Sequence, residues 1–187
     1  MKKNNGNIKK FYHYSFPMQA ALIACKEKKE NTTNIITIAW HTPLSKKPPL
    51  YGASIAPKRY SHKLIENKKE FTINFAPIKQ LRKVHFCGTH TGKNTDKIKK
   101  TNLTLSSSKK IDTPIINECY AHLECKLYDK KKVGDHTFFI GRIVNVLFDE
   151  NAFKKDILDN REIKPCYYLG SNQYTTIGEK KRKIFSD

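Results

Sequence analysis

The chain has 187 residues, which suits one domain, and its hydrophobic content of 38%, with 11% aromatic residues, excludes a disordered protein. Its apolar runs fall far short of the about 20 residues that a membrane-spanning helix needs, so we expect no membrane association. Basic side chains outnumber acidic ones by 36 to 17, which gives a formal net charge of +19.

This charge raises the alternative of a cofactor-free, basic nucleic-acid-binding protein. The basic residues are mostly lysines and are spread along the whole chain instead of forming one tract. Bidentate contacts to phosphates and guanine edges favour arginine, so we expect no specific nucleic-acid partner. The arginines are Arg59, Arg82, Arg142, Arg161 and Arg182.

The first residues carry lysines with no apolar segment behind them, which does not fit a secretory signal, so a cytoplasmic protein is expected. Residues 1–14 are predicted to be a basic, flexible leader and residues 15–187 a single domain. The cysteines are odd in number and form no CxxC pair, which favours free thiols in a reducing compartment.

Strand-like segments dominate the rest of the chain. Alternating or continuous apolar residues predict strands over 20–26, 34–40, 50–55, 71–75, 121–128, 137–148, 167–170 and 173–177. Short helices are predicted over 61–69, 78–85, 95–100 and 152–158. Consecutive strands joined by tight turns indicate a mainly β fold with an antiparallel sheet, curled into a barrel or packed as a sandwich.

The segment 137–148 is apolar on both faces of its predicted strand. A strand of this kind needs cover on both sides. One face can line a barrel while the other forms a subunit interface, and we expect a homodimer. The alternative is a sandwich core in a monomer.

The segment 50–75 predicts a buried strand, a turn at Ala56-Pro57, a short helix and a second strand. Ser54, Arg59 and Ser61 therefore gather where a helix begins. The unpaired N–H groups and positive dipole end of a helix N-terminus make a phosphate site there. The alternative is an ordinary turn with Ser61 as N-cap and a solvated Arg59.

An ordered set of segments extends this pattern: Asn34–Pro49 before the junction, then Phe86-Cys87-Gly88, Thr91-Gly92-Lys93 and Asp96-Lys97, then Gly134-Asp135-His136. In this order and at these distances the chain resembles the flavin reductase-like family, and within it the flavoredoxin branch. The resemblance implies an antiparallel Greek-key split β-barrel with a few short helices, which dimerises and binds FMN at the subunit interface. It also implies electron transfer through noncovalent FMN, with NAD(P)H or an acidic redox protein as donor.

The resemblance assigns phosphate contacts to the junction and to the loop that contains Lys93. Lys97 is expected to be a more distant or merely solvated charge. The strand end at Ala39 and Trp40 would lie along the flavin ring, although Trp40 also suits a core position. The full set of expected cofactor-binding residues is Ala39, Trp40, His41, Thr42, Ser54, Arg59, Tyr60, Ser61, Cys87, Gly88, Gly92 and Lys93.

His136 is the candidate catalytic residue. It stands in a Gly-Asp-His triplet before a strand, where the resemblance implies contact with flavin or nicotinamide, and an imidazole there can donate a hydrogen bond to either. The alternative is a solvated histidine in a turn. His85, Cys87 and His90 could in principle form a metal site, but no matching second pair exists and we predict none.

Overall fold

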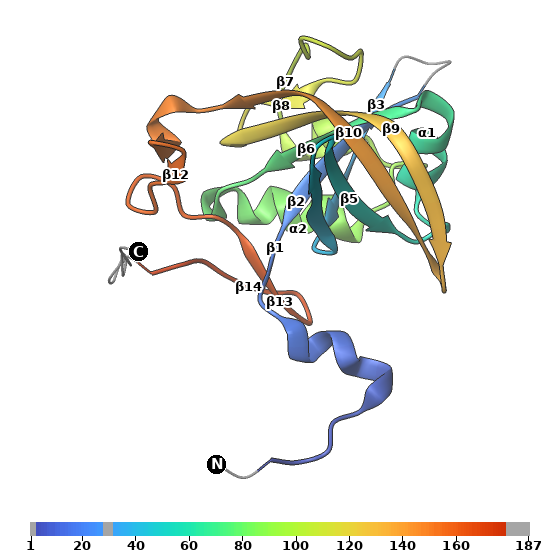
Figure 1. Ribbon diagram of the computed structural model, residues 1–187, viewed down its shortest axis with the longest axis vertical. Coiled ribbons are helices and arrows are strands. Elements are labelled where there is room, and N and C mark those ends of the chain that lie inside the picture. Colours follow the sequence, from blue (N-terminus) through green and yellow to red (C-terminus); the bar gives the residue numbers. More distant parts are fainter. Residues whose placement is uncertain (1–2, 28–31, 179–187) are drawn as a thin grey trace.

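A seven-stranded antiparallel sheet forms the body of the protein (Figure 1). The computed structural model describes residues 3–27 and 32–178, so the extreme ends of the predicted leader and domain lie outside the described residues. The strand order is β3-β2-β6-β9-β10-β5-β4. The strands are β2 (Ala21–Lys26), β3 (Thr33–Ile38), β4 (His41–Lys46), β5 (Pro49–Ile55), β6 (Glu70–Phe75), β9 (Ala121–Val133) and β10 (His136–Phe148).

The two edge strands of this sheet, β3 and β4, are consecutive in the chain. Only Ala39 and Trp40 separate them, and the Ser54 N–H of β5 donates to the Trp40 carbonyl at 2.9 Å. The chain thus passes from one edge of the sheet to the other within two residues, which curls the sheet round into a barrel. The predicted mainly β, antiparallel split barrel is confirmed, and Ala39-Trp40 marks its open edge.

Strand β2 is covered on both faces, which is why its sequence is continuously apolar. Ala21 and Ile23 belong to the core inside the barrel, whereas Leu22 and Ala24 belong to a second core on the other face. Helical residues such as Val84 complete the second core. The helices are α1 (Tyr60–Lys68), η2 (Ile78–Gln80), α2 (Leu81–Thr89) and α3 (Lys97–Thr101).

The two ends of the chain meet in a small separate sheet of order β1-β13-β14. The N-terminal helix η1 precedes β1, and Figure 1 shows both below the barrel beside the β13–β14 hairpin. Residues 8–14 of the predicted leader lie in this 3-10 helix, while the flexibility of the leader stays a prediction. The elements are η1 (Ile8–Ser15), β1 (Met18–Gln19), β13 (Tyr167–Gly170) and β14 (Gln173–Thr175).

The predicted helix over 152–158 is wrong. A 3-10 turn, η3 (Glu150–Ala152), leads into a short hairpin of β11 (Phe153–Lys154) and β12 (Ile157–Leu158). Lys155 and Asp156 have φ angles of 49° and 62°, a left-handed conformation that stops a helix and suits a two-residue hairpin turn. Strand β4 and the short pair β7 (Leu105–Ser106) and β8 (Ile115–Ile116) were not predicted.

Across the described residues, no helix is both long and apolar enough to cross a membrane.

Candidate functional site

Two adjoining cavities lie where β3 leaves the sheet and α1 begins. The larger has a volume of about 680 Å³ and the smaller about 160 Å³. Ile36, Lys58, Arg59 and Gly88 line both of them, so the two cavities form one site with two compartments. The larger volume lies within the range of about 300–1,000 Å³ that is typical of small-molecule pockets.

The smaller cavity is built around the N-terminus of α1. Arg59 is the N-cap residue, and its side chain makes no capping hydrogen bond, so N–H groups at the start of the helix remain available to a ligand. Lys58 and Arg59 add two cationic side chains beside the positive end of the helix dipole. This compartment favours an anion that accepts several hydrogen bonds at once, as a phosphate does.

A buried amide faces the same compartment. Asn34 is 7% exposed, and its Nδ2 donates to Ser61 Oγ at 2.7 Å. Its Oδ1 is buried without a hydrogen-bond partner among the described residues. A Cβ on Gly92 would meet that oxygen at 2.0 Å, so the chain can lie this close to Asn34 only because residue 92 has no side chain. Because this oxygen is an acceptor, it suits a ligand group that donates a hydrogen bond.

Lys97 is the buried cation of the small cavity. It is 4% exposed, and its Nζ donates to the carbonyls of Ile35 at 2.7 Å and Cys87 at 2.8 Å. Burial lowers the pKa of its ammonium group. Of the two alternatives expected for Lys97, the merely solvated charge is wrong: the side chain ties β3 to the end of α2 and lines the compartment where we expect the anion.

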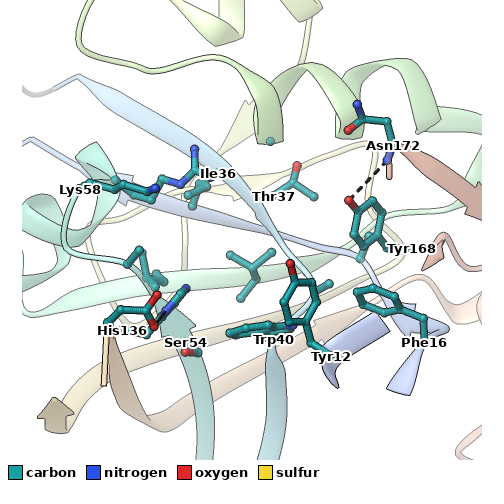
Figure 2. A pocket seen from close by; sticks show the side chains of 18 of the residues that line it. Tyr12, Phe16, Ile36, Thr37, Trp40, Ser54, Lys58, His136, Tyr168 and Asn172 are labelled. Atoms are coloured by element: carbon teal, nitrogen blue, oxygen red, sulfur yellow. Dashed lines mark hydrogen bonds and ion pairs between the residues drawn. The ribbon is translucent and has the colours of Figure 1, made fainter. Parts of the chain in front are cut away.

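The larger cavity is lined by aromatic rings and by the open edge of the barrel (Figure 2). The rings of Trp40 and His136 lie 5.0 Å apart, centroid to centroid, at a tilt of 39°. His136 Nδ1 is 2.7 Å from Asp135 Oδ1, and this carboxylate orients the imidazole at the rim. Interaction with His136 lowers the pKa of Asp135, so the carboxylate stays ionised.

Most of the residues expected from the sequence line one compartment or both. These are Ala39, Trp40, Ser54, Arg59, Tyr60, Ser61, Gly88, Gly92 and His136. Trp40 is therefore a cavity residue rather than a closed core aromatic.

The other four expected residues do not line either cavity. His41 turns away and bonds the Tyr51 hydroxyl and the Gln19 carbonyl, each at 2.8 Å, and burial lowers the pKa of its imidazole. Thr42 and Lys93 are exposed. Cys87 is fully buried and contributes its carbonyl to Lys97.

Two local expectations need correction. Ser61 does not cap α1: it is the second helical residue, 1% exposed, and it accepts from Asn34. Cys87 and Gly88, which the predicted helix over 78–85 left out, belong to α2, because that helix continues to Thr89. Gly88 allows this helix to lie against β3, since a Cβ there would be 3.3 Å from Thr37 Cβ.

The metal alternative gains no support from the placement of its residues. His85 faces Tyr174, and His90 stacks on the ring of Phe86 at 3.8 Å. Within the described ranges, no three His, Cys, Asp or Glu side chains converge on a possible metal position.

One wall of the larger cavity was not predicted from the sequence. It is formed by the N-terminal helix η1 with the residue that follows it and by the β13–β14 hairpin. The missed residues were assigned to a leader or to closing strands, although the aromatic residues Tyr12 and Phe16 stand four positions apart, which is a signal that could have been used. The site also includes Asn34 and Lys58, which were not singled out. The residues of the missed wall are Tyr12, Phe16, Tyr168, Asn172 and Tyr174.

An antiparallel split barrel with a two-compartment cavity at its open edge defines the class of protein. The family model for the flavin reductase like domain matches residues 13–176. The chain belongs to the flavin reductase-like family, as the sequence resemblance predicted.

Individual relatives agree with this assignment. An uncharacterized protein of Pyrococcus abyssi is 38% identical over 143 residues, which cover 76% of this chain and 81% of that protein. The crystal structure of an FMN-binding protein from Thermus thermophilus with bound p-hydroxybenzaldehyde is 29% identical, covers 98% of this chain and 99% of its own, and has a TM-score of 0.81. The flavoredoxin of Desulfovibrio vulgaris (Miyazaki F) is 26% identical, with coverage of 100% and 98% and a TM-score of 0.86.

Proposed function

We propose that the protein binds FMN noncovalently and transfers electrons through it, as a flavin reductase or a flavoredoxin-like carrier. The observation that carries this proposal is the junction of the two compartments: a cationic pocket at a helix N-terminus opens directly into an aromatic-lined cavity. A flavin mononucleotide has the matching shape, with an anionic phosphate at one end and a flat, largely apolar ring at the other. The names of the FMN-binding and flavoredoxin structures support the same cofactor.

In this proposal the small cavity holds the phosphate. Arg59 and the N–H groups at the start of α1 contact its outer oxygens, while Lys97 approaches from the buried side. The unpaired Oδ1 of Asn34 is an acceptor, so it suits a hydroxyl of the flavin's ribityl chain and not the acceptor oxygens of the phosphate. Hydrogen bonds between charged groups are stronger than neutral ones, and they are stronger still in a cavity that is shielded from water. This compartment therefore supplies much of the affinity for FMN.

The larger cavity holds the ring against the backbone of 36–40 and beside Trp40. The flavin supplies the redox chemistry, and the protein orients it and limits access of water. His136 stands at the rim with one nitrogen fixed by Asp135, so its other nitrogen can donate to the ring or to an incoming electron donor. Either NAD(P)H or an acidic redox protein suits a chain with a net charge of +19.

A homodimer is part of the same proposal. The residues of β10 that face away from the barrel interior include Val146 and Phe148, each 52% exposed. Their neighbours along the strand are partly exposed as well. A second copy that covers this face would bury apolar surface which an isolated chain leaves in water.

The phosphate assignment predicts a difference between two cations. Arg59→Ala should weaken FMN binding about tenfold, because a charge-assisted hydrogen bond is lost at an exposed position. Lys93→Ala, the matched control, should weaken it less, since Lys93 does not line the cavity. Calorimetric titration with FMN and with riboflavin, which has no phosphate, measures both.

Equal losses of FMN and riboflavin affinity in Arg59→Ala would contradict the phosphate role. Native protein that stays colourless on purification and binds no FMN at micromolar concentration would overturn the proposed function. That outcome would favour the cofactor-free nucleic-acid-binding alternative, in which binding depends steeply on salt.

His136→Ala should bind FMN almost as well as the native protein and should be reduced about tenfold more slowly. The expected loss corresponds to one hydrogen bond made in the transition state. Stopped-flow reduction with NADH, NADPH and dithionite separates the donors. Unchanged rates with every donor would make His136 a structural turn residue, and reduction of the native protein by dithionite alone would select the carrier over the reductase.

A further inference from the structure

The hairpin of β9 and β10 reaches beyond the rest of the large sheet (Figure 1). Strand β6 pairs with β9 only as far as Lys126, and β5 pairs with β10 no nearer to the turn than Thr137. Past these points, within the described part of the chain, the two strands pair only with each other. We call this projecting segment, residues 127–136, the hairpin arm.

The hairpin arm carries positive charge that the fold does not neutralise. Lys130, Lys131 and Lys132 follow one another along β9, and all three are exposed. Lys130 pairs with Glu66 of α1. Lys131 and Lys132 form no ion pair with any described residue, so their ammonium groups are available to a partner.

Lysines on an unpaired strand edge also keep other strands from pairing there. That role explains the charge of the hairpin arm but not its apolar side chains. Tyr128 is 56% exposed and Val133 is 58% exposed. Exposed apolar residues between lysines do not protect an edge, whereas a protein-binding surface combines apolar contacts with a charged rim.

The hairpin arm ends at the rim of the larger cavity. Val133 pairs with His136, and Lys131 pairs with Phe138. Paired residues of antiparallel strands project from the same face, so Lys131 and Val133 lie on the face of the arm that carries His136. Because His136 lines the cavity, a protein bound to this face stands at the cavity mouth.

Lys58 extends the positive charge across this mouth. It is exposed and lines both compartments. The hydrogen bond with His136 makes the largest contribution to the lowered pKa of Asp135, and the charge of Lys58 adds to it, so Lys58 lies near the turn of the arm. Lysines therefore flank His136 on two elements, and an acidic surface is their electrostatic complement.

We propose that the hairpin arm, together with Lys58, is the docking surface for an acidic, one-electron redox protein that reduces the flavin. The inference rests on the proposed function for the presence of FMN, and it selects a protein donor over NAD(P)H. Each encounter passes one electron to the flavin and oxidises one partner molecule. Two encounters and one proton from the solvent complete the reduction. The lysines raise the rate of encounter, and the apolar side chains of Tyr128 and Val133 contact the docked partner.

The test uses a reduced, acidic iron–sulfur ferredoxin as the protein donor. Reduced methyl viologen serves as a small donor that needs no docking surface. Stopped-flow reduction of FMN-loaded protein is measured with each donor at low and at high salt. The double variant Lys131→Glu, Lys132→Glu should be reduced by ferredoxin about tenfold more slowly at low salt, because the attraction is reversed. Salt should slow the native protein with ferredoxin, and the rate with methyl viologen should not fall in the variant.

The double variant Lys109→Glu, Lys110→Glu is the matched control. These neighbouring lysines are also exposed, and their backbone N–H groups bond Glu124 near the other end of β9. The control changes the net charge by the same amount at a place away from the cavity. Its rate with ferredoxin should therefore fall about twofold at most, through the general field of the protein.

Equal slowing of the two double variants would overturn the docking surface. So would reduction by ferredoxin that does not depend on salt, or failure of ferredoxin to reduce protein that methyl viologen reduces. A changed oligomeric state of Lys131→Glu, Lys132→Glu would assign the hairpin arm to a contact between two copies of this chain. Binding of duplex DNA as tightly as ferredoxin would show only a general attraction for anions, and both outcomes would also overturn the proposal.

Calorimetric titration of flavin-free protein with ferredoxin separates this inference from the proposed function. Ferredoxin binding that Lys131→Glu, Lys132→Glu loses and the control keeps, in a protein that binds no FMN, would keep the docking surface and overturn the proposed function. Tight FMN binding, with the same ferredoxin affinity in both double variants, would do the reverse.

Discussion

A Lys97→Met protein is expected to bind FMN about a hundredfold more weakly than the native protein. The ammonium group is buried, so its contact with a phosphate is poorly screened by solvent and salt and stands at the strong end of charged hydrogen bonds. Arg59, at the exposed mouth, should matter less. Riboflavin affinity should change little, because riboflavin lacks the phosphate.

The same substitution has opposing effects on stability. Loss of Lys97 leaves the carbonyls of Ile35 and Cys87 without their donor, which costs about 1–3 kcal/mol for each. Removal of an ammonium group that is held away from water, with its pKa lowered by burial, offsets part of this cost. The free energy of unfolding of flavin-free protein should therefore fall by less than the carbonyl losses alone.

Lys99→Met is the matched control, because Lys99 lies on the same short helix and is exposed. It removes an equal charge from the chain and should leave FMN binding almost unchanged. Titration with FMN and riboflavin, together with urea unfolding of each variant, measures both quantities. An equal loss of affinity for the two flavins would mean that Lys97 acts only by joining β3 to α2.

The pattern of apolar residues predicted most strands of the barrel. Each of these strands shows alternating or continuous apolar residues within its own segment, so it can be identified without knowledge of its partner strands. Residues 167–170 were predicted as a strand and form β13 over those residues. Strand β4, in contrast, contains Pro43 and alternates poorly, and it forms because β5 pairs with it. The wrong helix at 152–158 arose because lysine and aspartate at 155 and 156 carry no composition signal for positive φ.

The part of the candidate site that was predicted from the sequence is the part in which several site residues belong to one short segment. Arg59 and Ser61 stand together at a strand–helix junction that the sequence displays. Lys97 could not be identified in the same way, because the chain has many lysines and its local sequence does not show which one is buried. Tyr12 and Tyr168 line the same cavity because β1 pairs with β13, a contact between segments far apart in the sequence.

A buried histidine on β9 gives the protein a dependence of stability on pH. His122 is 7% exposed, and its Nδ1 lies 2.9 Å from Asn74 Oδ1. Burial lowers the pKa of its imidazole to about 4, although a backbone contact with Cys119 and the nearby Glu124 act in the opposite direction. The folded protein therefore holds this side chain neutral.

The free energy of unfolding should fall as the pH is lowered from about 6.5 to about 4. Between these pH values His122 takes up a proton in the unfolded chain but not in the folded one, which favours the unfolded chain. The stabilisation is therefore complete above pH 6.5, the unfolded pKa, and is lost as the pH falls to the folded pKa of about 4. A shift of this size corresponds to roughly 3 kcal/mol. His62, whose pKa is also lowered by burial, adds a change of the same sign.

The variant His122→Gln keeps an amide donor for Asn74 and cannot titrate. Urea unfolding at pH 4, 5, 6 and 7 should show that its free energy of unfolding falls less between pH 7 and pH 4 than that of the native protein, by roughly 3 kcal/mol. Parallel profiles for the variant and the native protein would show that the folded state accepts a proton at His122 as readily as the unfolded chain does.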